Sequence, residues 1–481
     1  MSIQKKMSIA TLWAIVERGG QQAISFLVFL VIARFVGPEE YGMAMLCFIY
    51  LSATNLLLSS LAESIVVFQI KDRERLSMLF GFTMITGIIL SVLCFTFSEF
   101  AAKVLGDIRI GSLLRYLSLV PILIATISVP QLIVLRELDF KIYAIRSLCA
   151  SIGSGVIGIT LAYYGAGAYA LIFQQIVLYF IANIVLWAFI DWRPQWIFNR
   201  KLLIDTIKPG FNLMGSNFVS VCEEQVPRVI IASILDTISV GFYTFAYRMT
   251  AALKDILIMP SISTLYPALA KLNNDINRQK ELIGHMIFLI GFIVVPTLSF
   301  ASITAPIYIT LFFSDKWSGS TQLLQLLLIM GCLSPFINIV RVICRSHNCV
   351  GAFFKLQSIL VATLLICLLF LTPYGLTTVG YGMLFFTAIT IPIYFIFLSK
   401  YLKFSLWEQI HNIFASSIAT IGMLLTVKVS ITILDPIFTW LSLFVIILIG
   451  IISFIFFNLL LQRKRLFSVY KFVSSLTTSK Q

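Results

Sequence analysis

A small set of ionisable side chains lies inside stretches of sequence that are otherwise apolar, and these residues could carry chemistry. A charged side chain at the middle of a bilayer costs about 3 kcal/mol, so such residues usually face a polar cavity or pair with each other. Arginine suits oxyanions because its planar guanidinium donates two parallel N–H bonds, whereas carboxylates can bind hydroxyl groups, a proton or a cation. The sequence therefore predicts a polar site that contains both signs of charge. The candidates are Glu17, Arg18, Glu63, Glu223, Glu224, Arg228, Arg248 and Lys254.

The spacing of these residues leaves a second interpretation open for part of the set. Glu224 and Arg228 are four residues apart, and Arg248 and Asp255 are seven apart. On a helix, either spacing places both side chains on one face, so each pair could be a structural ion pair instead. Arg18 lies near the end of its apolar stretch, and its long side chain could extend to the membrane surface. The spacing is therefore compatible with a role in the polar site and with a purely structural role.

The apolar stretches that must position these residues dominate the chain. Hydrophobic residues make up 59% of the 481 residues and charged residues only 12%, whereas soluble domains have about 45–50% and about 25%. A membrane-spanning helix needs about 20 mostly apolar residues. We therefore predict an all-α polytopic membrane protein with about fourteen transmembrane helices. Their approximate ranges are 11–35, 42–68, 78–98, 113–135, 143–164, 168–190, 209–233, 240–268, 282–304, 322–344, 354–372, 376–399, 411–433 and 438–461.

Lysine and arginine are distributed unevenly between the connections of the predicted helices. Roughly 25 of the 35 fall on alternate connections, a set that includes both termini, and cytoplasmic connections are the ones that carry such an excess. Both termini are therefore predicted to be cytoplasmic. The same topology accounts for the net charge of +14 without a nucleic-acid partner.

The chain also contains a faint internal repeat. Residues 33–42 lie between the first two predicted helices, and residues 232–241 lie between the seventh and the eighth. Because six helices separate the two segments, both have the same orientation, and the repeat predicts two lobes related by a pseudo-twofold axis along the membrane normal. The predicted lobes are residues 1–200 and 201–400, and residues 401–481 form two further helices and a cytoplasmic tail.

The sequence lacks the patterns of common enzymes and metal sites. The eight cysteines are scattered, and Cys344 and Cys349 have no second pair of metal ligands at a suitable spacing. There is no Gly-x-x-x-x-Gly-Lys-Ser/Thr segment, no Asp-x-Asp and no loop of the size that a catalytic domain needs. We predict no metal, no cofactor and no enzymatic activity.

Three segments resemble a known family. One is the sequence Ala33-Arg34-Phe35-Val36-Gly37-Pro38-Glu39-Glu40-Tyr41-Gly42 after the first predicted helix, another is Val240–Arg248 after the seventh, and the third is Phe313–Trp317 before the tenth. In these segments the chain resembles the polysaccharide flippases of the multidrug/oligosaccharidyl-lipid/polysaccharide (MOP) superfamily. Leu235-Asp236 departs from the Leu-Gly that the family commonly has at this place.

The resemblance implies two pseudo-symmetric six-helix lobes around a central cavity, followed by two extra helices. It implies that the protein moves an undecaprenyl-diphosphate-linked oligosaccharide across the bacterial inner membrane by alternating access, for O-antigen, capsule or exopolysaccharide. A polysaccharide polymerase and a chain-length regulator would be its partners. Arg18, Arg248 and Lys254 would contact the diphosphate or acidic sugars, with Arg228 in the same site. The carboxylates that would bind sugar hydroxyls or a coupling proton or cation are Glu17, Glu63, Glu223 and Glu224.

Two other functions compete with this one. A drug or cation antiporter of the same superfamily would share the two lobes, but such proteins typically have twelve helices and lack the sequence found at residues 37–42. A membrane-embedded polysaccharide polymerase or glycosyltransferase usually needs a larger loop or an acidic metal motif. The resemblance favours the flippase.

Overall fold

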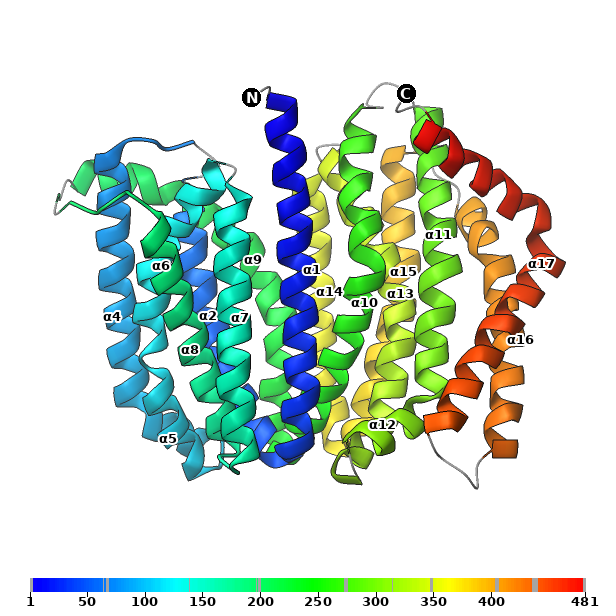
Figure 1. The fold of residues 1–481 in the computed structure, drawn as a ribbon, viewed down its shortest axis with the longest axis horizontal. Coiled ribbons are helices and arrows are strands. Elements are labelled where there is room, and N and C mark those ends of the chain that lie inside the picture. The colour runs from blue at the N-terminus through cyan, green and yellow to red at the C-terminus, as the bar shows by residue number, and fades with distance from the viewer. Residues whose placement is uncertain are drawn as a thin grey trace. The chain divides into compact units, whose positions relative to one another are not determined.

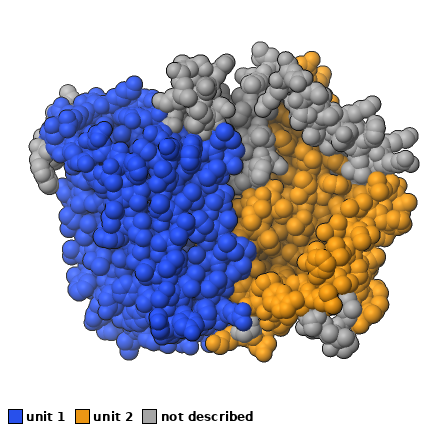
Figure 2. Space-filling view, viewed as in Figure 1, with its two compact units in different colours: residues 1–244 blue, residues 245–481 orange. Residues whose placement is uncertain are grey.

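The computed structural model describes residues 3–478, apart from 64, 66–68, 138, 196, 198–199, 272–275, 314, 347–348, 403–405 and 435–439. Every regular element in these ranges is a helix (Figure 1). The chain divides into two compact units, residues 1–244 and residues 245–481, which are coloured separately in Figure 2.

Unit 1 is a bundle of long apolar helices with short polar breaks between them. Aspartates begin several of them, because an aspartate side chain can accept a hydrogen bond from a free backbone N–H of the first turn. Asp72 accepts from the N–H of Glu74 at 3.1 Å, and Asp107 accepts from the N–H of Arg109 at 2.9 Å. The helices are α1 (Ile3–Phe35), α2 (Pro38–Ala62), α4 (Arg73–Val104), α5 (Ile108–Leu117), α6 (Val120–Arg136), α7 (Phe140–Tyr163), α8 (Ala168–Phe189), α9 (Arg200–Ile234) and the start of α10 (Thr237–Lys271).

Small residues bring the helices of unit 1 close together. Helix α7 packs along both α1 and α8. A Cβ on Gly155 of α7 would lie 2.5 Å from the side chain of Val28 in α1, and one on Gly20 of α1 would lie 2.8 Å from Leu148. These two contacts show that α1 and α7 run parallel. Close approach of this kind supplies the van der Waals contact that holds helices together where lipid removes the hydrophobic driving force.

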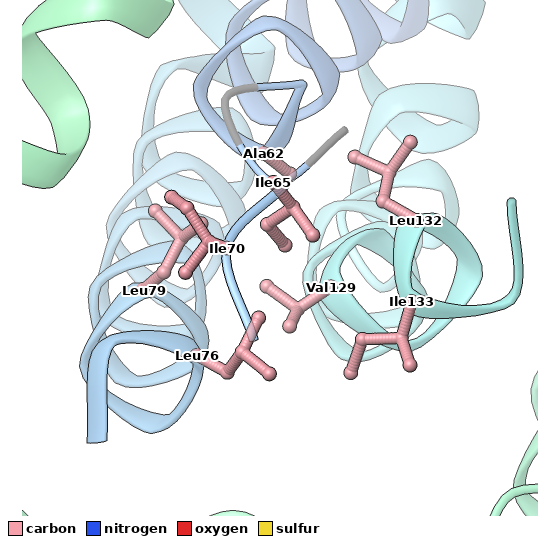
Figure 3. Close-up of a cluster of buried hydrophobic side chains, with 8 residues drawn as sticks. All are labelled: Ala62, Ile65, Ile70, Leu76, Leu79, Val129, Leu132 and Ile133. Carbon is pink, nitrogen blue, oxygen red and sulfur yellow. The ribbon is translucent and has the colours of Figure 1, made fainter. Parts of the chain in front are cut away.

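An apolar cluster forms where the chain after α2 meets α4 and α6 (Figure 3). The chain turns back after α2, and its side chains pack between the start of α4 and the end of α6. Arg136, at the end of α6, donates a hydrogen bond to the carbonyl oxygen of Ile70 in this turn and pairs with Glu137 at 2.9 Å. Ile65 and Ile70 are thereby fixed against α4 and α6. The cluster consists of Ala62, Ile65, Ile70, Leu76, Leu79, Val129, Leu132 and Ile133.

Unit 2 is also a bundle of long apolar helices. Helix α11 packs with α13 and α16, α13 packs with α15, and α16 packs with α17. Its elements after α10 are α11 (Ile276–Ile303), α12 (Ala305–Phe313), the 3₁₀ helix η1 (Asp315–Ser320), α13 (Thr321–Ser346), α14 (Val350–Leu371), the 3₁₀ turn η2 (Thr372–Tyr374), α15 (Leu376–Leu402), α16 (Leu406–Leu434) and α17 (Trp440–Thr478).

The prediction of an all-α multi-pass membrane protein is confirmed. In the described ranges, twelve helical segments are long and apolar enough to cross a membrane. Helices α9 and α10, of 35 residues each, cover the seventh and eighth predicted spans in addition. This is consistent with the predicted count of about fourteen. The predicted fourth span is built from two helices, α5 and α6, which break at residues 118–119.

Candidate functional site

The family-like segment at residues 37–42 begins helix α2 and is tightly packed. Pro38 occupies the first turn, where a missing N–H costs nothing. Glu39 and Glu40 follow in the same turn, where the helix dipole favours negative charge. Tyr41 is completely buried. Within unit 1, this segment therefore begins α2 and anchors its first turn by packing.

A small ion network surrounds Glu39. Arg109 donates to Glu39 and pairs with Asp107 at 2.7 Å. This hydrogen bond from Arg109 holds the pKa of the Asp107 carboxyl below its usual value. The side chains of Arg109 and Glu39 are both about half exposed, and exposed ion pairs contribute only about 0–1 kcal/mol each, so this pair positions α2 against α5 more than it stabilises the fold.

The two repeated segments touch each other through backbone atoms. A Cβ on Gly42 would lie 2.0 Å from the carbonyl oxygen of Thr237, and a Cβ on Gly241 would lie 2.0 Å from the carbonyl oxygen of Pro38. Pro38 and Thr237 occupy equivalent places in the repeat, as do Gly42 and Gly241. The contact is therefore reciprocal, as a local twofold relation requires, and it supports the predicted repeat. Only glycine permits an approach this close.

The other two family-like segments meet inside unit 2. Phe245 stacks on Trp317 with 4.3 Å between the ring centroids and meets Phe313 edge-on at 4.8 Å. All three side chains are buried, and Trp317 is completely so. Aromatic pairs in these geometries contribute about 0.5–1.5 kcal/mol beyond their buried area. These residues hold helix α10 to the α12–η1 corner.

Helix α9 brings several of the predicted site residues together in unit 1. Arg228 is buried, donates to the side-chain oxygen of Gln225 at 2.7 Å and lies 3.6 Å from Glu224. Glu223 and Glu224 are exposed. The charges of all three ionisable residues act on the buried hydroxyl of Tyr243 at the start of α10. The ion-pair geometry that the spacing of Glu224 and Arg228 allowed is thus the one observed.

Glu63 and the residues of α1 have distinct surroundings. Glu63 follows the last residue of α2 and lies within hydrogen-bonding reach of Asn217 on α9, whose amide also donates to Ser60 at 3.3 Å. On α1, Glu17 is buried and its neighbour Arg18 is exposed. The exposure of Arg18 fits either a cargo contact or the surface-reaching role.

The predicted site residues of unit 2 lie on α10. Arg248 and Lys254 are both half-buried, as is Asp255. The charge of Lys254 acts on the Asp255 carboxyl next to it. Half-burial of a cation in a membrane helix is compatible with the predicted contact to an anionic cargo.

A cavity of about 210 Å³ lies entirely within unit 1, among α1, α2, α6, α7 and α8. Arg146 of α7 is its charged residue, and its side chain is nine-tenths buried. The rest of the lining is neutral. The lining residues are Gln21, Asn55, Ile127, Gln131, Arg146, Ser147, Ala150, Ser151, Leu178, Tyr179 and Ala182.

Sequence reasoning missed Arg146. The predicted span 143–164 contains this residue, but it is not among the candidate site residues; the structure places it inside α7, seven residues after the Asp139 cap. One signal in the sequence could have found it. Ser147, Ser151 and Ser154 recur at helical spacing directly after it and form a small polar stripe that is buried.

Relatives of the chain are found among proteins of polysaccharide biosynthesis. The succinoglycan biosynthesis transport protein ExoT of Rhizobium meliloti is 22% identical over 325 residues, which are 67% of this chain and 66% of that protein. The lipopolysaccharide biosynthesis protein WzxC of Escherichia coli is 21% identical over 363 residues, 74% of this chain and 73% of that protein.

Solved structures show the same fold at lower identity. The lipid II flippase MurJ in an inward closed conformation superposes with a TM-score of 0.75 at 17% identity, covering 94% of this chain and 99% of that one. An inward-facing MATE family multidrug transporter of the MOP superfamily gives a TM-score of 0.64 at 16% identity, covering 81% and 98%.

The long apolar helices and the fold define an all-helical, multi-pass membrane protein with the fold that the MurJ and MATE structures share. A family model described as "Polysaccharide biosynthesis protein" matches residues 31–322, which is more than half of the chain. The chain belongs to this family, as the resemblance of residues 33–42, 240–248 and 313–317 predicted.

Proposed function

We propose that this protein flips a lipid-linked oligosaccharide, with undecaprenyl diphosphate as the carrier, across the bacterial inner membrane. The observation that carries the proposal is the family match over residues 31–322, which includes α2 and the predicted site residues of α9 and α10. The names of the relatives support it, because they describe a succinoglycan transport protein and a lipopolysaccharide biosynthesis protein. The chain is a transporter of surface-polysaccharide biosynthesis and not an enzyme.

In this proposal the two lobes, residues 1–200 and 201–400, open alternately to the two sides of the membrane. The polyprenyl tail stays in lipid while the polar head group crosses through the protein. Both termini are cytoplasmic, and residues 401–481 contribute the last two helices. A polysaccharide polymerase and a chain-length regulator act on the flipped unit afterwards.

The predicted site residues receive defined roles. Arg18, Arg248 and Lys254 contact the diphosphate or acidic sugars, because guanidinium and ammonium groups are strong donors to oxyanions. Arg228 acts with Glu224 and Gln225 to hold the α9 side of the site. Sugar hydroxyls or a coupling proton or cation bind to the carboxylates Glu17, Glu63, Glu223 and Glu224.

The drug or cation antiporter is the second candidate, because the MATE transporter shares the fold. A likeness at 16% identity concerns the fold alone, whereas the family match concerns this sequence. The flippase is therefore the better-supported function.

Deletion of the gene is expected to leave single lipid-linked oligosaccharide units on the cytoplasmic leaflet and to remove the surface polysaccharide. The measurement is the mass and the leaflet of the accumulated lipid-linked units, with the intact gene supplied on a plasmid as the control. Normal units on the outer leaflet with a defect in the polymer would favour an enzyme. The antiporter would be favoured if the polysaccharide were unchanged.

Alanine at Arg18 or at Arg248 is expected to reduce export at least tenfold while the protein still inserts into the membrane. Loss of one charge-assisted hydrogen bond is worth about 1.5–3 kcal/mol, which corresponds to about ten- to a hundred-fold in binding. Export is measured as surface polysaccharide per unit of membrane-inserted protein. Arg73→Ala, which removes an exposed cation from the first turn of α4, is the matched control. Normal export by both variants would refute these two roles.

A further inference from the structure

Several hydrogen-bond donors at the cavity in unit 1 have no acceptor among the residues that the structure describes. Asn55 donates its side-chain N–H to the hydroxyl oxygen of Tyr179 at 2.8 Å, so the hydroxyl proton of Tyr179 is available for another acceptor. The hydroxyl of Ser147 accepts from Arg146 at 2.9 Å and keeps its own proton to donate. The hydroxyl of Ser151 is buried and has no partner among the described residues. A cavity wall with spare donors favours a ligand that brings acceptors.

Within the described part of the chain, no ion pair neutralises the charge of Arg146. Among the described residues, no carboxylate oxygen lies within 4 Å of the Arg146 guanidinium. Arginine stays protonated in proteins, so burial cannot remove its charge. A buried charge without a counter-charge is costly, and it is tolerated where hydrogen bonds or a bound ion of opposite sign compensate it.

Neutral neighbours compensate only part of this cost. Arg146 donates one N–H to the side-chain oxygen of Gln131 and another to Ser147, and it lies 4.5 Å from the centre of the Tyr143 ring. These contacts fix the direction of the guanidinium. Its Nε–H has no partner in the part of the chain that the structure describes. The head group is therefore held in place with donor capacity left over.

The size of the cavity suits an oxyanion. A volume of about 210 Å³ corresponds to roughly seven water molecules at about 30 Å³ each, which is room for a phosphate or diphosphate group. Donors converge on this space from three helices, with Arg146, Ser147 and Ser151 on α7, Tyr179 on α8 and Asn55 on α2 orienting Tyr179.

We propose that this cavity is an oxyanion-binding site centred on Arg146, which takes a phosphate or diphosphate group. The group comes either from the carrier lipid of the cargo, an assignment that rests on the proposed function, or from free phosphate in the cell. Arg146 supplies the charge and a fixed fork, and the Tyr179 and Ser151 hydroxyls supply further hydrogen bonds.

The test is equilibrium binding of radiolabelled inorganic pyrophosphate and phosphate to the purified full-length chain in detergent. Wild type is expected to bind at least one of them, and Arg146→Gln is expected to bind at least tenfold more weakly. Arg146→Lys keeps the charge without the fork and should fall between the two. Lys141→Gln removes an exposed cation from the same helix and should bind like wild type.

A second variant keeps the proposal testable if Arg146→Gln does not fold. Ser151→Ala removes only a buried hydroxyl that has no partner among the described residues, so its size-exclusion profile should match wild type while its binding weakens about threefold or more. Absence of pyrophosphate and phosphate binding to wild type would overturn the proposal. Equal binding by wild type and the Arg146 and Ser151 variants would also overturn it.

The source of the anion is decided by a separate measurement. If the cargo supplies it, Arg146→Lys loses export in cells in parallel with pyrophosphate binding. If free phosphate supplies it, binding weakens in the purified variant while the amount of exported polysaccharide stays normal. Because binding is measured without cargo, a failure of the flippase proposal in the deletion experiment leaves this result unaffected.

Discussion

Alanine at Gly241 is expected to lower both the amount of folded protein in the membrane and its melting temperature, and alanine at Gly42 should do the same. The new Cβ would lie 2.0 Å from a backbone carbonyl oxygen, where ordinary contact begins at 3.4 Å. Backbone cannot rotate away as a side chain can, so the starts of α2 and α10 would have to separate by more than about 1 Å. Overpacking of this kind typically costs about 1–3 kcal/mol and sometimes more.

The measurement is the amount and melting temperature of the detergent-extracted protein. Gly37→Ala is the matched control, because this glycine lies in the same segment, has φ of −75° and would place a new Cβ with nothing within 4 Å of it. The Gly42→Ala/Gly241→Ala double variant should lose less than the sum of the single losses, since both changes open the same contact. Single variants that melt like wild type would show that the contact is not tight in the molecule.

Hydropathy and residue spacing were sufficient for much of this fold. The apolar stretches gave the helices because a chain in lipid must satisfy its backbone within each segment, which leaves the helix as the available form. The repeat at Gly42 and Gly241 was visible because equivalent positions keep the same residue. What it predicted was two related lobes, and the structure adds that the repeated glycines lie against each other's segments.

The position of Arg146 in a cavity could not be predicted from the sequence. A single arginine near the end of an apolar stretch has the same pattern whether it faces the membrane surface or a cavity. The difference arises because α1, α2, α6, α7 and α8 bring residues as distant as Gln21 and Tyr179 to one place. Hydropathy along the chain contains no information about that convergence. By contrast, Glu224 and Arg228 are neighbours on one helix, so their spacing was enough to predict that they could form an ion pair.

The family resemblance also identified residues without showing which role they have in the structure. Phe245, Phe313 and Trp317 belong to the segments by which the chain resembles its family, and such segments are easily taken for cargo contacts. In the structure their rings are buried against each other. In this chain these rings therefore build a corner of the fold, separately from the residues that are predicted to contact the cargo.

Replacing Trp317 by alanine is expected to destabilise unit 2 by about 3–5 kcal/mol, the usual cost of deleting a large buried aromatic side chain. The loss combines the empty volume with the missing stack on Phe245 at 4.3 Å. For a unit of this size each kcal/mol lowers the melting temperature by about 2–4 °C, so a fall of roughly 10 °C is expected. Fluorescence-detected size exclusion after heating measures it.

Two further variants separate packing from transport. Trp440→Ala removes a tryptophan that is 57% exposed, and it should change the melting temperature little. In a double-mutant cycle, Phe245→Ala and Trp317→Ala should show a coupling of about 0.5–1.5 kcal/mol. If Trp317→Ala lowers export only in proportion to the folded protein that remains, the segment serves the fold. A variant of unchanged melting temperature that no longer exports would instead place Trp317 in the transport cycle.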